Sequence, residues 1–246
     1  MKVLKILVCI VSISISSLTS AATNQEQVLN KMFNKHNEQQ ISVERSVSSL
    51  LKSYPELQES IITLAFKKYP DKYKQVIRGS LSADPSHAHK VIEISMKQEV
   101  AHCDEIIKVA INFEPAYADD IVLMASELHP NDRNQVYIAA LNAKPVMATS
   151  VVNSVIHRYP DDFDELLNIA FEQLPDSVTS LTNNAYTNFP DNGENILNLS
   201  LKNSTDKNLK EIVESATKAG LSNSTIIDAA VNAGMEKEDV EEIFPS

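Results

Sequence analysis

The sequence predicts an all-α protein: an α-solenoid of about eleven 15-residue repeats, each a single helix, stacked in an antiparallel zigzag. Three observations predict this fold. Nine prolines share one 15-residue lattice, a pair of apolar residues follows most lattice points at a fixed distance, and a small residue follows that pair. Self-similarity at a fixed period is the signature of a repeat architecture.

The prolines define the period. Every gap between consecutive members of the set is 15 or 30 residues, and the lattice points without proline are Val100 and Thr205. The nine lattice prolines are Pro55, Pro70, Pro85, Pro115, Pro130, Pro145, Pro160, Pro175 and Pro190.

The apolar columns predict a helix in each repeat. The paired apolar residues stand six and seven positions after the lattice point, as in Ile61-Ile62. A small residue stands ten positions after it, as in Ala65, and a large apolar residue eleven positions after it, as in Phe66. Offsets 6, 7, 10 and 11 form one stripe on a helix but scatter over both faces of a strand.

The prolines exclude one long supercoiled helix, because each would remove a hydrogen bond and cost about 3 kcal/mol inside a helix. Proline at the first helical turn carries no such cost, so each repeat is expected to begin there with 11–12 helical residues. The residue before proline is expected to be extended, with an apolar side chain such as Tyr159 or Phe189 packed between successive helices. The residue after it is expected to cap the helix or to complement its positive end; these residues are Asp71, Asn131, Asp161, Asp176 and Asp191.

A single short helix cannot bury its own apolar stripe, and stacking on its neighbours in chain order can. The expected superhelix is similar in general appearance to HEAT-type and TPR-type stacks, although its unit is half as long. The chain carries no tetratricopeptide or ankyrin signature.

The predicted organisation has four parts, of which the last three form one continuous domain over 22–246. Residues 1–21 read as a signal peptide, 22–53 as N-terminal capping helices, 54–218 as the repeats and 219–246 as C-terminal capping helices. Gly220 and Gly234 are expected to end helices in this last part.

The N-terminal sequence predicts export, to the periplasm or outside the cell. Two lysines, an apolar run over 6–15 and small residues up to Ala22 are typical of a secretory signal peptide. Without residues 1–21 the chain has 20 Lys and Arg against 33 Asp and Glu, a net charge of −13. This charge argues against nucleic acid as a partner, and no later stretch predicts membrane insertion.

Few residues suggest chemistry. His87, His89, His102 and Cys103 are weak candidates for a metal site, since His87 and His102 occupy one column of adjacent repeats. The competing interpretation is that the histidines are solvated turn residues and that Cys103 fills a partly buried position. No catalytic motif is present in the sequence, so we expect no enzyme activity and no cofactor.

Charge is the stronger signal. Residues 52–98 hold eight basic and five acidic residues, whereas residues 99–195 hold four basic and sixteen acidic. Either the acidic surface is only solvated, or it binds a basic partner, or opposite ends of two copies attract one another. The candidate partner surface consists of acidic pairs, Asp104 with Glu105, Asp119 with Asp120 and Asp164 with Glu165.

The leading functional hypothesis is an exported, non-enzymatic protein–protein interaction module or scaffold, in the bacterial envelope or outside the cell. The alternative is a self-assembling structural component of an extracellular fibre or matrix, built head to tail. A metal-binding protein is the third hypothesis. The residues expected to bind lie at offsets 1–5, 8 and 9, which vary between repeats while the apolar stripe does not.

Overall fold

The computed structural model describes residues 24–244, which fall into two compact units, one ending at His102 and one beginning at Cys103. All regular structure in the described range consists of α-helices and short 3-10 turns. The predicted all-α class is therefore confirmed. The predicted signal peptide, residues 1–21, lies outside the described range.

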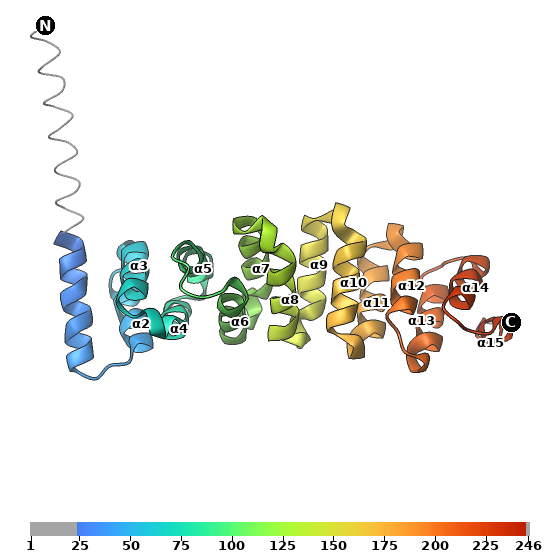
Figure 1. The fold of residues 1–246 in the computed structure, drawn as a ribbon, viewed down its shortest axis with the longest axis horizontal. Helices are drawn as coiled ribbons and strands as arrows, with labels where there is room; N and C mark the ends of the chain where they lie inside the picture. The colour runs from blue at the N-terminus through green and yellow to red at the C-terminus, as the bar shows by residue number, and fades with distance from the viewer. Residues whose placement is uncertain (1–23, 245–246) are drawn as a thin grey trace, which may run out of the picture. The chain divides into compact units, whose positions relative to one another are not determined.

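The first unit begins with a helix over residues 24–38 and continues with α2 to α5 (Figure 1). The α-helices are α2 (Val43–Ser53), α3 (Gln58–Lys68), α4 (Tyr73–Ala83) and α5 (Ala88–Lys97), and the 3-10 turns are η1 (Pro55–Leu57), η2 (Pro70–Lys72) and η3 (Pro85–His87).

The second unit contains α6 to α15. Its α-helices are α6 (Cys103–Phe113), α7 (Ala118–Leu128), α8 (Arg133–Ala143), α9 (Ala148–Arg158), α10 (Phe163–Gln173), α11 (Val178–Asn188), α12 (Gly193–Lys202), α13 (Asp206–Lys218), α14 (Asn223–Asn232) and α15 (Lys237–Glu241). Its 3-10 turns are η4 (Pro115–Tyr117), η5 (Pro130–Asp132), η6 (Pro145–Met147), η7 (Pro160–Asp162), η8 (Pro175–Ser177) and η9 (Pro190–Asn192). Helices α3 to α13 are the eleven repeats that the lattice predicts.

Each unit has two layers of helices, because a helix packs against its sequence neighbours and also against the next helix but one. In the first unit α2 lies beside α4, and α3 lies beside α5. In the second unit α6, α8, α10, α12 and α14 form one layer, and α7, α9, α11 and α13 form the other. Stacking in chain order is the arrangement of a solenoid-like repeat protein.

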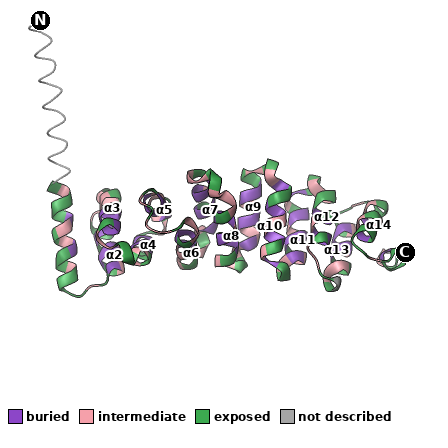
Figure 2. Ribbon diagram, viewed as in Figure 1, coloured by how far each residue is buried: buried purple, intermediate pink, exposed green. Residues whose placement is uncertain are grey.

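The core lies between the two layers of each unit, where Figure 2 shows the helices buried on their inner sides. Every residue six or seven positions after a lattice proline is buried, including Thr182, which replaces an apolar residue. Buried serines in the small-residue column donate to a carbonyl of their own helix, as Ser80 Oγ does to Val76 O at 2.9 Å. A hydroxyl that is bonded in this way is buried at little cost.

Each lattice proline begins a 3-10 turn, and the α-helix follows directly. The turn is closed by a main-chain bond across it, as between Lys72 N and Tyr69 O at 2.9 Å. The residue before proline is only partly extended, with φ −130° and ψ 56° at Tyr69. The prediction of an extended residue is therefore wrong at most junctions, although Asp84, with φ −159° and ψ 123°, is extended and accepts the same bond from His87 N at 3.0 Å.

Of the two predicted roles of the residue after proline, the side-chain cap is not observed among residues 24–244, whereas an acidic residue in the first turn is present at Asp71, Asp161, Asp176 and Asp191. Within the described range none of the acidic or amide residues that follow a lattice proline bonds a helix N-terminus through its side chain; they are Asp71, Asn131, Asp161, Asp176 and Asp191. The 3-10 turn already uses main-chain groups at this position. At one lattice junction the residue before proline supplies a side-chain cap, where Asp84 Oδ1 accepts from Ser86 N at 2.9 Å, and Ser42 and Ser222 cap α2 and α14.

Four junctions are built differently, around a residue with positive φ: Gln40 (58°), Glu99 (49°), Gly220 (86°) and Gly234 (99°). The next residue donates its N–H to a carbonyl five residues earlier, as Val100 does to Ser95 O at 3.2 Å. This is the Schellman pattern of helix termination. It confirms the two predicted glycine caps and explains why Val100 is a lattice point without proline.

Candidate interaction surface

Helices of one layer are joined along their outer faces by side-chain bonds between residues 31 positions apart. Asn134 Nδ2 donates to Glu165 Oε1 at 2.6 Å, and Asn142 Nδ2 donates to Gln173 Oε1 at 2.8 Å. Because both ends of α8 and α10 are paired at the same offset, these two helices run parallel. The helix between them therefore runs antiparallel to both, as the zigzag predicts.

The same spacing recurs in the other layer. Arg158 Nη2 donates to Glu127 Oε1 at 2.6 Å, and Ser150 Oγ donates to Asp119 Oδ2 at 2.5 Å. A side chain used in this way is held in one direction on the surface. The outer faces are therefore ordered polar surfaces as well as solvated ones.

The six acidic residues predicted to form a partner surface do not lie together. Asp104, Glu105, Asp164 and Glu165 belong to α6 and α10, in one layer, whereas Asp119 and Asp120 belong to α7, in the other. Successive repeats alternate between the two layers, and the acidic pairs come from repeats of both layers. The second unit therefore offers two acidic faces in place of one.

Most of these carboxylates have partners inside the unit. Asp104 accepts from Lys108 Nζ at 2.7 Å, Asp164 from Asn195 Nδ2 at 2.9 Å and Glu165 from Asn134. Asp119 Oδ2 accepts from both Ser150 and Ser154. Of the six, Asp120 is an exposed carboxylate for which the described range shows no such bond.

The candidate metal ligands are divided between the two units. His87 lies in η3, where its Nδ1 is 3.2 Å from the carbonyl of Ser80, and His89 lies exposed on α5. His102 ends the first unit and Cys103 begins the second. Among residues 24–244 no group of three His, Cys, Asp or Glu side chains is placed to hold a metal ion.

The Cys103 thiol is half-buried at the start of α6. Burial, and next the negative charge of Asp132, raise the pKa of this thiol above its ordinary value. The reactive form of cysteine is the thiolate, which this environment disfavours. The structure thus places Cys103 in a setting that suits a packed side chain.

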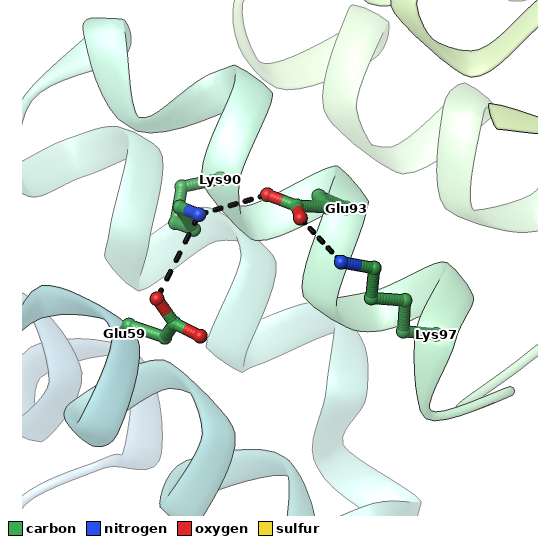
Figure 3. A network of polar contacts seen from close by, with 4 residues as sticks. All are labelled: Glu59, Lys90, Glu93 and Lys97. Atoms are coloured by element: carbon green, nitrogen blue, oxygen red, sulfur yellow. Dashed lines mark hydrogen bonds and ion pairs between the residues drawn. The ribbon is translucent and has the colours of Figure 1, made fainter. Parts of the chain in front are cut away.

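A lysine–glutamate network joins α3 and α5 in the first unit (Figure 3). Lys90 Nζ lies 2.9 Å from Glu93 Oε2 and 3.8 Å from Glu59 Oε2, and Lys97 Nζ lies 2.5 Å from Glu93 Oε1. Hydrogen bonds from the two lysines lower the pKa of Glu93 to about 2. The Lys90–Glu59 pair has the same 31-residue spacing as the bonds of the second unit.

The aromatic residues before proline contact the layer neighbour two repeats earlier. The Arg133 guanidinium lies over the Tyr159 ring at 4.5 Å, and Phe163 meets Phe189 edge-on at 5.5 Å. The prediction that these rings pack between successive helices is therefore corrected to next-but-one helices. Such contacts add about 0.5–1.5 kcal/mol beyond area burial.

Sequence reasoning missed that the true structural unit is a pair of repeats. At offset 3, one layer of the second unit has small or branched buried residues, namely Ala118, Ala148 and Val178. The other layer of that unit has Cys103, Arg133, Phe163 and Gly193 at this offset. This 30-residue alternation was the signal that could have revealed the two layers.

The two units differ strongly in charge. Residues 24–102 contain eleven Lys and Arg against nine Asp and Glu, a net charge of +2. Residues 103–246 contain nine against twenty-four, a net charge of −15. A net charge as large as that of the second unit creates an electrostatic potential that attracts oppositely charged partners and repels like-charged ones.

Fold and surface together define a helical-repeat protein of the solenoid type. Compared with known protein families, with curated proteins and with solved structures, the chain matches none of them. No helix in the described residues combines the length and apolar character needed to cross a bilayer.

Proposed function

We propose that this chain is an exported, non-enzymatic helical-repeat protein that acts as a protein–protein interaction module or scaffold, in the bacterial envelope or outside the cell. The observation that carries the proposal is the division of charge between the units, +2 against −15. An excess of carboxylates on ordered helix faces favours a basic protein partner and disfavours nucleic acid and anionic lipid.

The difference between the inward and outward positions of each repeat supports the same proposal. Inward offsets hold a nearly constant set of apolar and small residues, while outward offsets vary from repeat to repeat. Bonds between layer neighbours fix the direction of outward side chains such as Glu165 and Asp164. A surface with fixed side chains loses less conformational freedom on binding.

Capture from the envelope fraction of the producing cells tests the proposal. The chain is immobilised and washed at about 50 mM and about 500 mM salt, and its partners are compared with those of D161N/D191N. These exposed aspartates occupy equivalent positions 30 residues apart on turns η7 and η9. A specific partner should be released by salt and weakened several-fold by the double neutralisation.

A matched variant controls for net charge. K202Q/K218Q changes two exposed lysines and should strengthen or preserve capture. Partners bound equally by the wild type and by D161N/D191N at both salt concentrations would contradict an acidic docking surface.

The alternative function, head-to-tail assembly into a fibre or matrix, is favoured by the same opposition of charge. Multi-angle light scattering on the purified chain separates the two, because a scaffold for other proteins stays monomeric at high concentration. A mass that grows without limit would favour the structural component.

A further inference from the structure

The first unit contains an open groove of about 380 Å³ between α2 and α4. Its lining includes two cations and four hydroxyls, from Arg45, Lys52, Ser48, Ser49, Ser53 and Ser82. Glu44 is the acidic residue in the lining. The groove lies wholly within one unit.

Close packing of the two helices forms the groove. Gly79 of α4 lies against the main chain of α2 near Glu44, and short serine side chains cover the neighbouring positions. Larger residues at these positions would fill the space between the cations.

The cations of this face are not neutralised within the described part of the chain. Arg45 and Lys52 are exposed and make no ion pair there, and neither does Arg78 on the exposed side of α4. The arginine and lysine side chains and the serine hydroxyls can all donate hydrogen bonds to carboxylates, although the hydroxyls can accept bonds as well. Arg45 and Lys52 are seven positions apart, about 10 Å along α2.

The second unit carries a segment of opposite character at its C-terminal end. Residues 236–242 include five acidic side chains, all exposed: Glu236, Glu238, Asp239, Glu241 and Glu242. The one basic residue of the segment, Lys237, pairs with Glu241 at 3.4 Å. Val240 is buried and fixes the segment to its unit.

We propose that the acidic segment 236–242 of one copy docks in the α2–α4 groove of a second copy. The segment spans about 9 Å between Glu236 and Glu242 at helical rise, close to the separation of the two groove cations. The groove has room for a few side chains, and the docked carboxylates neutralise Arg45 and Lys52. The contact joins two different surfaces and is therefore heterologous.

This inference deepens the alternative function, head-to-tail assembly, by naming the two surfaces that meet, and it rests on that alternative. Its test uses only the purified chain, whereas the proposed function is tested with other proteins. A chain that stays monomeric while still capturing a basic partner would overturn the inference and leave the proposed function standing.

Sedimentation equilibrium of the full chain from 5 µM to 1 mM, at about 50 mM salt, provides the readout. The weight-average mass should rise with concentration for the wild type and fall back at about 500 mM salt. R45E/K52E and E238K/E242K should each weaken association at least tenfold. An equimolar mixture of these two variants should restore it, because each then offers the surface that the other has lost.

The matched control is K31E/K35E, which makes the same charge change on exposed lysines of the helix over 24–38. It should associate within about twofold of the wild type. If circular dichroism finds R45E/K52E unfolded, R45Q/K52Q replaces it in the same comparison. A wild type that remains monomeric at 1 mM, a control that loses association equally, or a mixture that is not restored would each overturn the proposal.

Discussion

Gly79 in α4 lies directly against Glu44 in α2: a Cβ atom at position 79 would stand 2.5 Å from the Glu44 main-chain oxygen and 3.0 Å from the Val47 Cβ. Main-chain atoms of a helix cannot move aside as the end of a flexible side chain can. This one absent methyl group sets the distance between two helices.

Gly79→Ala should therefore destabilise the protein by about 1–3 kcal/mol, the usual cost of overpacking. The matched substitution is Gly193→Ala, where the new Cβ would meet the flexible end of Leu221 at 3.1 Å. Because alanine favours the helical conformation there, this variant should be neutral or slightly stabilised. Urea unfolding followed by circular dichroism gives both values, and equal effects at the two glycines would contradict the packing argument.

Proline at position 100 should destabilise the fold. Val100→Pro removes the bond to Ser95 O and places proline after Glu99, which has a φ of 49°. The loss should be about 3 kcal/mol or more.

Thr205→Pro provides the comparison, since Thr205 is the other lattice point without proline. In the described part of the chain its N–H makes no main-chain bond, and its φ of −103° is negative. We expect a clearly smaller loss than at position 100, measured as the shift in thermal midpoint. Equal losses at the two positions would show that the Schellman junction is not what excludes proline.

These junctions mark where sequence reasoning succeeded and where it stopped. The proline lattice and the apolar columns identify the repeats, the helices and the buried residues, because burial requires a fixed stripe. The sequence does not mark Glu99 as a residue with positive φ, because glycine is the residue that favours such a conformation. The surface was less predictable still, because adjacent repeats that look equivalent in the sequence belong to opposite layers.

Tyr137 is fully buried in α8, and its hydroxyl has no partner among the described residues. Tyr137→Phe should therefore be neutral or stabilising by about 1 kcal/mol. The comparison is Tyr54→Phe, at a half-buried position, which should change stability by less than about 0.5 kcal/mol. A loss of more than 1 kcal/mol in Tyr137→Phe would indicate that the hydroxyl is bonded.

Alkaline pH should destabilise the wild type through the same residue. Burial raises the pKa of Tyr137 and of Tyr186 above the ordinary value of 10.0. The unfolded chain then releases protons that the folded chain retains, so stability falls as the pH rises above about 10. Tyr137→Phe should flatten this decline in urea midpoints between pH 9 and 11, and an unchanged slope would contradict the assignment.

Glu93 should titrate far below an ordinary glutamate. Its pKa is about 2, against 4.5 for the unperturbed group, because Lys90 and Lys97 bond its carboxylate. The stability that it contributes is present above pH 4.5 and is lost as the pH falls towards 2, with a size of about 0.5–1 kcal/mol for surface pairs. Carboxyl NMR of the wild type, with Glu93→Gln to assign the signal, measures this pKa; a value near 4.5 would refute the network.

The 31-residue spacing of the outer bonds limits how such a chain can change its length. Loss of one 15-residue repeat would transfer every later helix of the second unit to the opposite layer. Asn134 would then lie beside a residue that belongs to the other layer in the present structure. Loss or gain of two repeats at once would leave every later helix in its present layer. Lineages of this protein should therefore shorten and lengthen in steps of thirty.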